Sequence, residues 1–272
     1  MTTPAWLSHF GFREPPFAKE ILDNDLWLPP SKAALVDDLV DALDERASIL
    51  LTGDPGVGKT CVLRALRARL PEAGFRLTYC HNATLGRRDF YRQLCLALGL
   101  TPSATAAALF YAISTHVQDL GRDKVHPVFL LDEAHLLHQD TLDHLHILLN
   151  YNWDSRALLS LILVGLPELH DRLSLRRNRS LQSRVHYRFS VGPLTLADTA
   201  AYLALRLKQA GVTDPLFAPE ALARLHETTL GVLRDIDRIA AAALRDAARK
   251  KRRIVESDLI DRAESVASRE AA

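Results

Sequence analysis

The sequence predicts an α/β protein with a three-layer core, in which helices cover both faces of a parallel sheet, followed by a small all-helical domain. Three observations predict this fold class. Short apolar runs with the length of buried strands alternate with amphipathic helical segments up to residue 192. A glycine-rich turn and a helix follow the first of these runs. Beyond Pro193 the apolar residues have helical spacing throughout.

Residues 1–30 are rich in aromatic residues and prolines, and we expect an irregular arm whose aromatic side chains pack on another part of the chain. The core domain, residues 31–192, begins with a helix that has Ser31 as its N-cap. The helical domain covers residues 193–272. The predicted strands are 48–52, 75–80, 125–131, 158–164 and 185–191. The predicted helices are 59–70, 88–98, 104–120, 196–210, 219–228, 231–249 and 256–268.

The composition is that of a soluble globular protein. The chain has 272 residues, of which 48% are hydrophobic and 25% charged, and its net charge is +1. These values exclude disordered, collagen-like and disulfide-rich classes. The cysteines Cys61, Cys80 and Cys95 lack CxxC spacing, which indicates reduced thiols. The sequence has neither a signal peptide pattern nor an apolar run near the ~20 residues that span a bilayer, so we expect a cytoplasmic protein without membrane contact.

A segment with the pattern GxxxxGK[ST] follows the first predicted strand. It comprises Gly53, Asp54, Pro55, Gly56, Val57, Gly58, Lys59 and Thr60, and Cys61 follows it. The glycines let backbone amides surround phosphate oxygens, and the helix N-terminus adds positive partial charge. Lys59 would neutralise the β- and γ-phosphates, and the Thr60 hydroxyl would bind Mg²⁺. The segment predicts binding of ATP together with Mg²⁺.

An acidic pair, Asp132 and Glu133, ends the third predicted strand. We expect Asp132 to hold Mg²⁺ through water and Glu133 to take a proton from the attacking water. The letters DEAH at 132–135 also occur in helicases, but no set of helicase motifs accompanies them. The nearby histidines lack HExxH spacing, and we expect solvated helix side chains rather than a metal site. These histidines are His135, His138, His144 and His146.

Charge is segregated along the nearly neutral chain. Residues 1–46 hold nine acids and four bases, residues 172–188 hold six arginines and no acid, and residues 245–253 hold six bases and one acid. Patches of one sign predict a polyanion as partner, or acidic neighbours across a subunit contact. For residues 249–253 a solvated helix end agrees equally well with the sequence.

With both nucleotide motifs in place, the chain resembles the AAA+ ATPases. More narrowly, it resembles the ExeA/GspA-type family and the transposition helper ATPases akin to TnsC and the phage Mu B protein. Besides the two motifs, the resemblance rests on His9-Phe10-Gly11-Phe12, Pro16-Phe17, Val164-Gly165-Leu166-Pro167-Glu168-Leu169, Ser183-Arg184-Val185 and Gly231-Val232-Leu233-Arg234. It implies a P-loop core with Walker A and Walker B motifs and a helical lid domain.

The resemblance also implies roles for individual arginines. Arg234 falls at the sensor-2 position, where it reaches the γ-phosphate from the lid. Arg184, or alternatively Arg179, falls where a neighbouring subunit supplies an arginine finger. Arg87 and Arg88 fall in the region that faces the channel of a TnsC-like ring, where they would contact DNA phosphates without reading the sequence.

Two residues depart from the family pattern. Leu166 stands near the place of the polar sensor-1 residue, so nothing polar from that strand would orient the attacking water. Leu233 stands where proline is frequent. Leu166 therefore predicts slow hydrolysis, and an arginine finger from a neighbouring subunit would make hydrolysis depend on assembly.

By resemblance, the first hypothesis is a transposition helper that forms a ring or filament with ATP, binds duplex DNA and cooperates with a transposase. The second is a secretion or cell-envelope ATPase that acts on protein complexes. Full-length members of that branch carry a membrane span after the ATPase part, and its absence from this sequence favours the first hypothesis. The third is an ATP-binding switch without hydrolysis, which Leu166 motivates.

Overall fold

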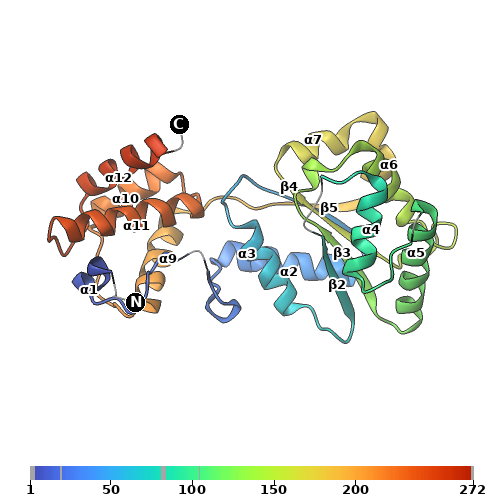
Figure 1. The fold of residues 1–272 in the computed structure, drawn as a ribbon, viewed down its shortest axis with the longest axis horizontal. Coiled ribbons are helices and arrows are strands. Elements are labelled where there is room, and N and C mark those ends of the chain that lie inside the picture. The colour runs from blue at the N-terminus through green and yellow to red at the C-terminus, as the bar shows by residue number, and fades with distance from the viewer. Residues whose placement is uncertain (1–3, 19, 81–83, 104, 271–272) are drawn as a thin grey trace. The chain divides into compact units, whose positions relative to one another are not determined.

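A computed structural model describes residues 4–18, 20–80, 84–103 and 105–270 (Figure 1). The chain divides into two compact units. The sheet unit comprises Pro30–Pro55 and Lys59–Val191, and the helical unit comprises Met1–Pro29, Gly56–Gly58 and Gly192–Ala272. The predicted α/β class with a helical C-terminal region is confirmed.

The sheet unit contains a parallel sheet of five strands in the order β2-β3-β4-β1-β5. The strands are β1 (Ser48–Thr52), β2 (Phe75–Cys80), β3 (His126–Leu131), β4 (Ser160–Gly165) and β5 (Val185–Ser190). Every residue of β3 and β4 is buried, as expected for central strands covered on both faces. Each predicted strand is present within two residues of its predicted ends.

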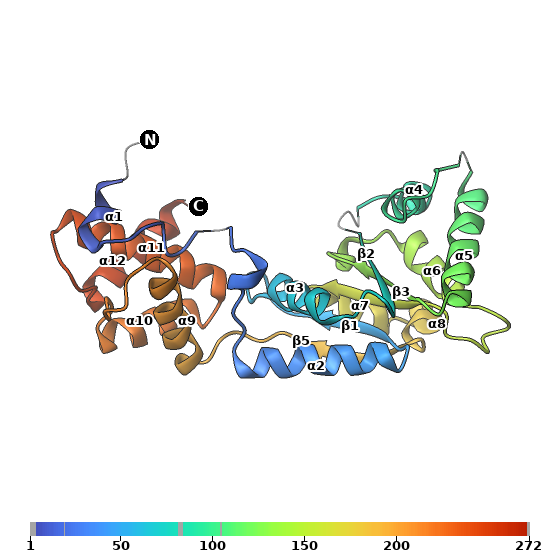
Figure 2. The ribbon, with the colours of Figure 1, turned by 90° about the horizontal axis from the view of Figure 1, so that it is seen from below.

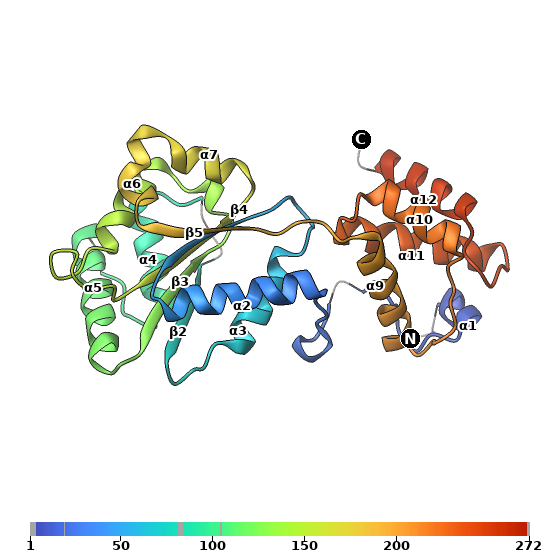
Figure 3. The same ribbon diagram turned by 180° about the vertical axis from the view of Figure 1, so that it is seen from behind.

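Helices cover the two faces of this sheet, as Figures 1 and 3 show from opposite sides. One face carries α2 (Pro30–Asp44) and α3 (Lys59–Arg69), and the other carries α4 to α8 with two short 3-10 helices. Those elements are α4 (Arg87–Ala97), α5 (Ala106–Arg122), η2 (Ala134–Leu136), α6 (Gln139–Leu148), α7 (Glu168–Ser174), η3 (Arg176–Asn178) and α8 (Arg179–Gln182). Alternate strand residues such as Phe129, Leu131 and Leu161 form one apolar cluster with the second set of helices.

Three details differ from the sequence prediction. Helix α2 begins at Pro30 rather than after a Ser31 N-cap, because the fixed φ of proline suits a first helical turn. Helix α5 has Thr105 as its N-cap, whose side chain accepts a hydrogen bond from the Ala108 amide, while the predicted start, Ala104, lies outside the described residues. Helices α6, α7 and α8 have no predicted range; α7 and α8, with seven and four residues, are too short for a helical period to be read.

The helical unit combines the N-terminal arm with four C-terminal helices (Figure 2). These are α9 (Leu196–Gln209), α10 (Pro219–Thr229), α11 (Leu233–Arg249) and α12 (Ser257–Glu270). The prediction of an irregular arm is wrong in part, because α1 (Ala5–Phe10) and η1 (Asp23–Asp25) form within it. The arm residues Phe10 and Phe12 join the apolar cluster of α9 to α12, so the arm completes the core of this unit.

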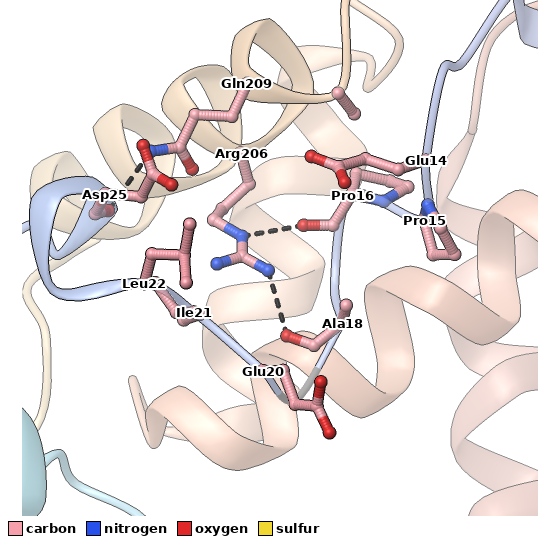
Figure 4. Close-up of a pocket in the computed structure, with 11 residues that line it drawn as sticks. Glu14, Pro15, Pro16, Ala18, Glu20, Ile21, Leu22, Asp25, Arg206 and Gln209 are labelled. Atoms are coloured by element: carbon pink, nitrogen blue, oxygen red, sulfur yellow. Dashed lines mark hydrogen bonds between the residues drawn. The ribbon is translucent and has the colours of Figure 1, made fainter.

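A buried arginine also fastens the arm to α9 (Figure 4). The Arg206 Nε donates to the Pro16 carbonyl oxygen at 2.6 Å, and its Nη2 donates to the Ala18 carbonyl oxygen at 3.0 Å. The Gln209 amide donates to the Asp25 carbonyl oxygen at 3.1 Å. Residues of the arm and of α9 line a partly open cavity of about 230 Å³ beside these bonds. The side chain of one helix residue thus satisfies two backbone acceptors of the arm.

Candidate active site

The glycine-rich loop leaves the carboxyl end of β1 and enters α3. Gly56 has φ +83° and Gly58 has φ +101°, a left-handed backbone that favours glycine over residues with a side chain. The Gly53 amide donates to the carbonyl oxygen of Gly165 at 3.2 Å, which ties the start of the loop to the end of β4. Such a loop before a helix N-terminus is suited to bind phosphate oxygens.

Lys59 and Thr60 open α3 directly after the loop. The Lys59 Nζ donates to the carbonyl oxygens of Gly53 and Asp54 at 2.7 and 3.1 Å, so the ammonium group lies against its own loop. Thr60 is exposed and lines a cavity together with Asp132. A positive group, a hydroxyl and a glycine cradle fit the phosphates and Mg²⁺ of a bound nucleotide.

The acidic pair lies at the same edge of the sheet, where β3 ends. The Asp132 amide donates to the Cys80 carbonyl oxygen at 3.0 Å. Glu133 has φ +52°, a left-handed conformation that costs about 1–2 kcal/mol for a residue with a side chain. Its side chain is half exposed. Backbone strain of this kind is common at catalytic positions, so it agrees with the predicted role of Glu133 as base.

Sequence reasoning missed Tyr79, whose hydroxyl donates to the Asp132 Oδ2 at 2.8 Å. Burial raises the pKa of Tyr79, and the hydrogen bond to Asp132 raises it further. Tyr79 is half exposed and lies on β2, the strand next to β3. Only the register between the two strands brings its hydroxyl to the carboxylate, and no local sequence pattern carries that information.

His135 corrects one prediction. Its side chain is 10% exposed rather than solvated. Its Nδ1 lies 3.5 Å from the Glu133 Oε2 and 3.5 Å from the Leu166 backbone nitrogen. A polar ring from η2 therefore lies beside the end of β4, whereas the residue that β4 itself places there, Leu166, is apolar. The DEAH letters were the available signal, because they place a histidine two residues after the proposed base.

The other histidines lie on α6 and before it. His138 contacts the Thr84 carbonyl oxygen at 3.0 Å, and His144 contacts Arg87 at 2.7 Å between Nε2 and Nη1. Burial of the ring is the main cause that lowers the pKa of His144. Within the described residues, no group of three or more His, Cys, Asp or Glu side chains could hold a metal ion.

The predicted finger Arg184 lies at the opposite edge of the sheet from the glycine-rich loop. It directly precedes β5, and the register pairs Ser48 with Val185 at the amino edge and Thr52 with Ser190 at the carboxyl edge. The four steps from Ser48 to Thr52 along β1 separate these edges by about 13 Å, at ~3.3 Å per residue. Arg184 donates to the Asp154 Oδ2 at 2.8 Å, which holds it at the amino edge. The alternative finger, Arg179, is exposed at the start of α8.

The remaining predicted site arginines are exposed. Arg234 lies in the first turn of α11 in the helical unit. Arg87 and Arg88 form the first turn of α4 in the sheet unit. The sensor-2 role of Arg234 and the DNA contacts of Arg87 and Arg88 stay predictions.

The two basic segments contain several arginines and lysines with structural partners. The Arg172 Nη1 donates to the His135 carbonyl oxygen at 2.7 Å, and its Nη2 donates to the Leu137 carbonyl oxygen. Arg177 pairs with Asp143 at 3.1 Å, and in the second segment Arg252 pairs with Asp258 at 2.9 Å. Counting charges along the sequence therefore overstates the positive charge that a polyanion would meet.

The chain is similar to a described protein family and to a protein of a secretion pathway. Residues 41–173 match the family described as AAA domain. The chain is 34% identical over 255 residues to the General secretion pathway protein A of Aeromonas hydrophila, covering 92% of this chain and 46% of that protein. It therefore spans less than half of the length of that relative. Among the described residues, no helix is long and apolar enough to cross a membrane.

Solved structures share the fold at low sequence identity. The Aeropyrum pernix Orc1 protein in complex with DNA matches with a TM-score of 0.67 and 19% identity, over 95% of this chain and 70% of that chain. Drosophila ORC bound to DNA matches with a TM-score of 0.69 and 19% identity, over 96% and 65%. The Thermotoga maritima RuvB Holliday junction branch migration motor matches with a TM-score of 0.58 and 15% identity, over 92% and 73%.

Proposed function

We propose that this chain, which has the P-loop AAA+ fold and an AAA domain at residues 41–173, is an ATPase of the ExeA/GspA type that is active only as an assembly of its own copies. One observation carries the proposal. The glycine-rich loop and the pair Asp132–Glu133 share the carboxyl edge of the sheet, whereas the arginine that directly precedes β5 lies at the amino edge.

Nucleotide binding follows from the loop. Its amides and the N-terminus of α3 would surround the phosphates, and Lys59 would leave its two carbonyl partners to pair with them. The Thr60 hydroxyl and Asp132 would hold Mg²⁺, which supplies charge neutralisation at the phosphates when bound. Glu133 would accept a proton from the attacking water, and His135 lies close enough to orient the Glu133 carboxylate.

Hydrolysis would require a second copy. The charge that develops on the transferred phosphoryl group needs a cation, and Arg184 is held at the wrong edge to supply it within its own chain. A neighbouring copy would present Arg184 instead, after its bond to Asp154 opens. Arg234 would act as the sensor-2 group of the same chain. Phosphate release per chain should then rise with protein concentration.

Variants of the two edges test this proposal. Lys59→Ala should abolish nucleotide binding, and Glu133→Gln should bind ATP without releasing phosphate. Arg184→Ala should bind ATP with unchanged affinity and release no phosphate. When Lys59→Ala and Arg184→Ala are mixed, the Lys59→Ala copy supplies an intact Arg184 and the Arg184→Ala copy supplies an intact loop. At the contacts where these two meet, part of the activity should return. Full activity of Arg184→Ala alone would refute the assignment, and loss of activity in Arg179→Ala would transfer the role to Arg179.

We further propose duplex DNA as the partner, with a role as a transposition helper that works with a transposase. The exposed pair Arg87–Arg88 supports this, because the first turn of a helix adds backbone amides to the two guanidinium groups that a phosphate would meet. Binding of a labelled duplex should require ATP and weaken steeply with salt. The double change Arg87→Ala and Arg88→Ala should remove most of it. Binding that ignores both ATP and salt would refute this part.

A role in secretion or at the cell envelope is the second candidate. The 34% identity to the General secretion pathway protein A favours it. It predicts cofractionation with envelope protein complexes and no affinity for duplex DNA. Nucleotide binding without phosphate release, even at high protein concentration and with DNA, would indicate a switch that does not hydrolyse ATP.

A further inference from the structure

Tyr79 occupies a particular place beside the proposed magnesium site. In the parallel register of β2 and β3, Tyr79 lies opposite Leu130, two residues before Asp132. Because alternate residues of a strand point to the same face, Tyr79, Leu130 and Asp132 share the face that α3 covers. All three line the same cavity, which confirms this placement.

Two bonds fix the carboxylate of Asp132. Its Oδ1 accepts a hydrogen bond from the Glu133 amide at 2.9 Å, and its Oδ2 accepts one from the Tyr79 hydroxyl at 2.8 Å. A carboxylate offers about four lone-pair sites, so each oxygen keeps one for a further donor. With both oxygens held, the carboxylate plane has one preferred orientation. The remaining lone pairs could accept hydrogen bonds from the water molecules of a hydrated cation, in a cavity that Arg64 and Arg67 also line.

The cavity beside this carboxylate measures about 240 Å³. Thr60, the proposed magnesium ligand at the start of α3, lies on its wall together with Asp132 and Tyr79. Since a water molecule takes about 30 Å³ of liquid volume, several waters fit there. The cavity thus joins the two groups proposed to hold Mg²⁺ with the tyrosine that orients one of them.

We propose that Tyr79 is a positioning residue that orients Asp132 for the water shell of Mg²⁺. This inference rests on the proposed function. A residue of the edge strand β2, which belongs to neither nucleotide motif, would then contribute to the affinity for Mg²⁺. Removing a residue that hydrogen-bonds to a metal ligand commonly lowers metal affinity by about tenfold or more. We expect no effect on groups that do not contact the metal.

The test compares Tyr79→Phe with Tyr111→Phe, a matched change at an exposed tyrosine on α5. Binding of a fluorescent ATP analogue is titrated with Mg²⁺, and separately measured in EDTA. Tyr79→Phe should raise the Mg²⁺ concentration for half-saturation roughly tenfold. Its affinity for the analogue in EDTA should equal that of the unchanged protein.

Three results would overturn the inference. The first is the same Mg²⁺ half-saturation in Tyr79→Phe, Tyr111→Phe and the unchanged protein. The second is an equal loss of analogue binding with and without Mg²⁺, because that would indicate general damage to the loop. The third is an unchanged protein that binds the analogue with no dependence on Mg²⁺. Absence of any analogue binding by the unchanged protein would, in contrast, remove the proposed function itself.

Discussion

Arg206 should contribute more to the free energy of unfolding than Arg224, although Arg224 has more ion pairs. Arg224 on α10 pairs with Asp261 at 2.6 Å and lies within 4.0 Å of Glu227 and Glu264, but its side chain is 44% exposed. Arg206 is 5% exposed, and its hydrogen-bond partners are the carbonyl oxygens of Pro16 and Ala18. Exposed pairs contribute little because water competes for both partners. The buried guanidinium of Arg206 should therefore matter more.

The magnitude follows from the two acceptors. Replacing Arg206 by methionine keeps a side chain of similar length but leaves both carbonyl oxygens without their donor. A bond from a charged donor contributes about 1.5–3 kcal/mol, so two give about 3–6 kcal/mol. The adjacent cavity of about 230 Å³ lets water reach the carbonyl oxygens. We therefore expect the lower end, a loss of about 3 kcal/mol in the free energy of unfolding.

Urea unfolding followed by tryptophan fluorescence measures this loss. Trp6 and Trp27 belong to the arm and pack against the apolar cluster of the helical unit, whereas Trp153 is fully exposed and gives a constant background. Trypsin should also cleave after Arg13 sooner in Arg206→Met. Arg224→Met is the control and should change both readouts little. An equal or larger loss in Arg224→Met would refute the argument from burial.

Two further predictions concern the sheet unit. Burial lowers the pKa of His126 to about 4. Between pH 6.5 and 4 the unfolded chain therefore binds more protons than the folded chain. The free energy of unfolding should fall by about 3 kcal/mol as the pH drops through this window. His126→Gln should flatten that part of the curve of unfolding free energy against pH, and an unchanged slope would contradict the assignment. Gly165→Ala should lower stability by about 1–3 kcal/mol, because its Cβ would lie 3.3 Å from the His135 backbone nitrogen and 2.9 Å from the Leu169 Cδ2. Gly86→Ala, where a Cβ meets no atom within 4 Å, is the control in urea unfolding, and equal losses in both variants would contradict the steric argument.

The sequence predicted those parts of the molecule whose physics is local. Residues 53–60 are contiguous, so glycine content, the preceding strand and the following helix could all be read together. Central strands such as β3 were recognisable because a strand buried on both faces must be apolar at every position. The arm was harder to predict, because Arg206 satisfies carbonyl groups that lie 190 and 188 residues away in the sequence.

The surroundings of the acidic pair were not predictable for a related reason. The bond between Tyr79 and Asp132 depends on how two strands are aligned, and a shift of one residue would turn the tyrosine to the other face. In the sequence His135 is one of four histidines in a polar stretch, whereas in the fold the turn that gives Glu133 its left-handed backbone places the His135 ring beside Leu166. The motif can thus be recognised from the spacing of its residues, whereas the side chains that contact it depend on strand register and turn geometry.

The same distinction applies to the charged segments, and it changes what a DNA-binding experiment should examine. Arg172 donates to two backbone carbonyl groups of the turn after Glu133, so replacing it would disturb the proposed catalytic site whether or not DNA binds there. Loss of DNA binding in such a variant would not identify a phosphate contact. Arg88 is exposed at the first turn of α4 and is a better probe, because its removal leaves that turn intact. A salt slope that falls by about one unit on removal of Arg88 would indicate one phosphate contact.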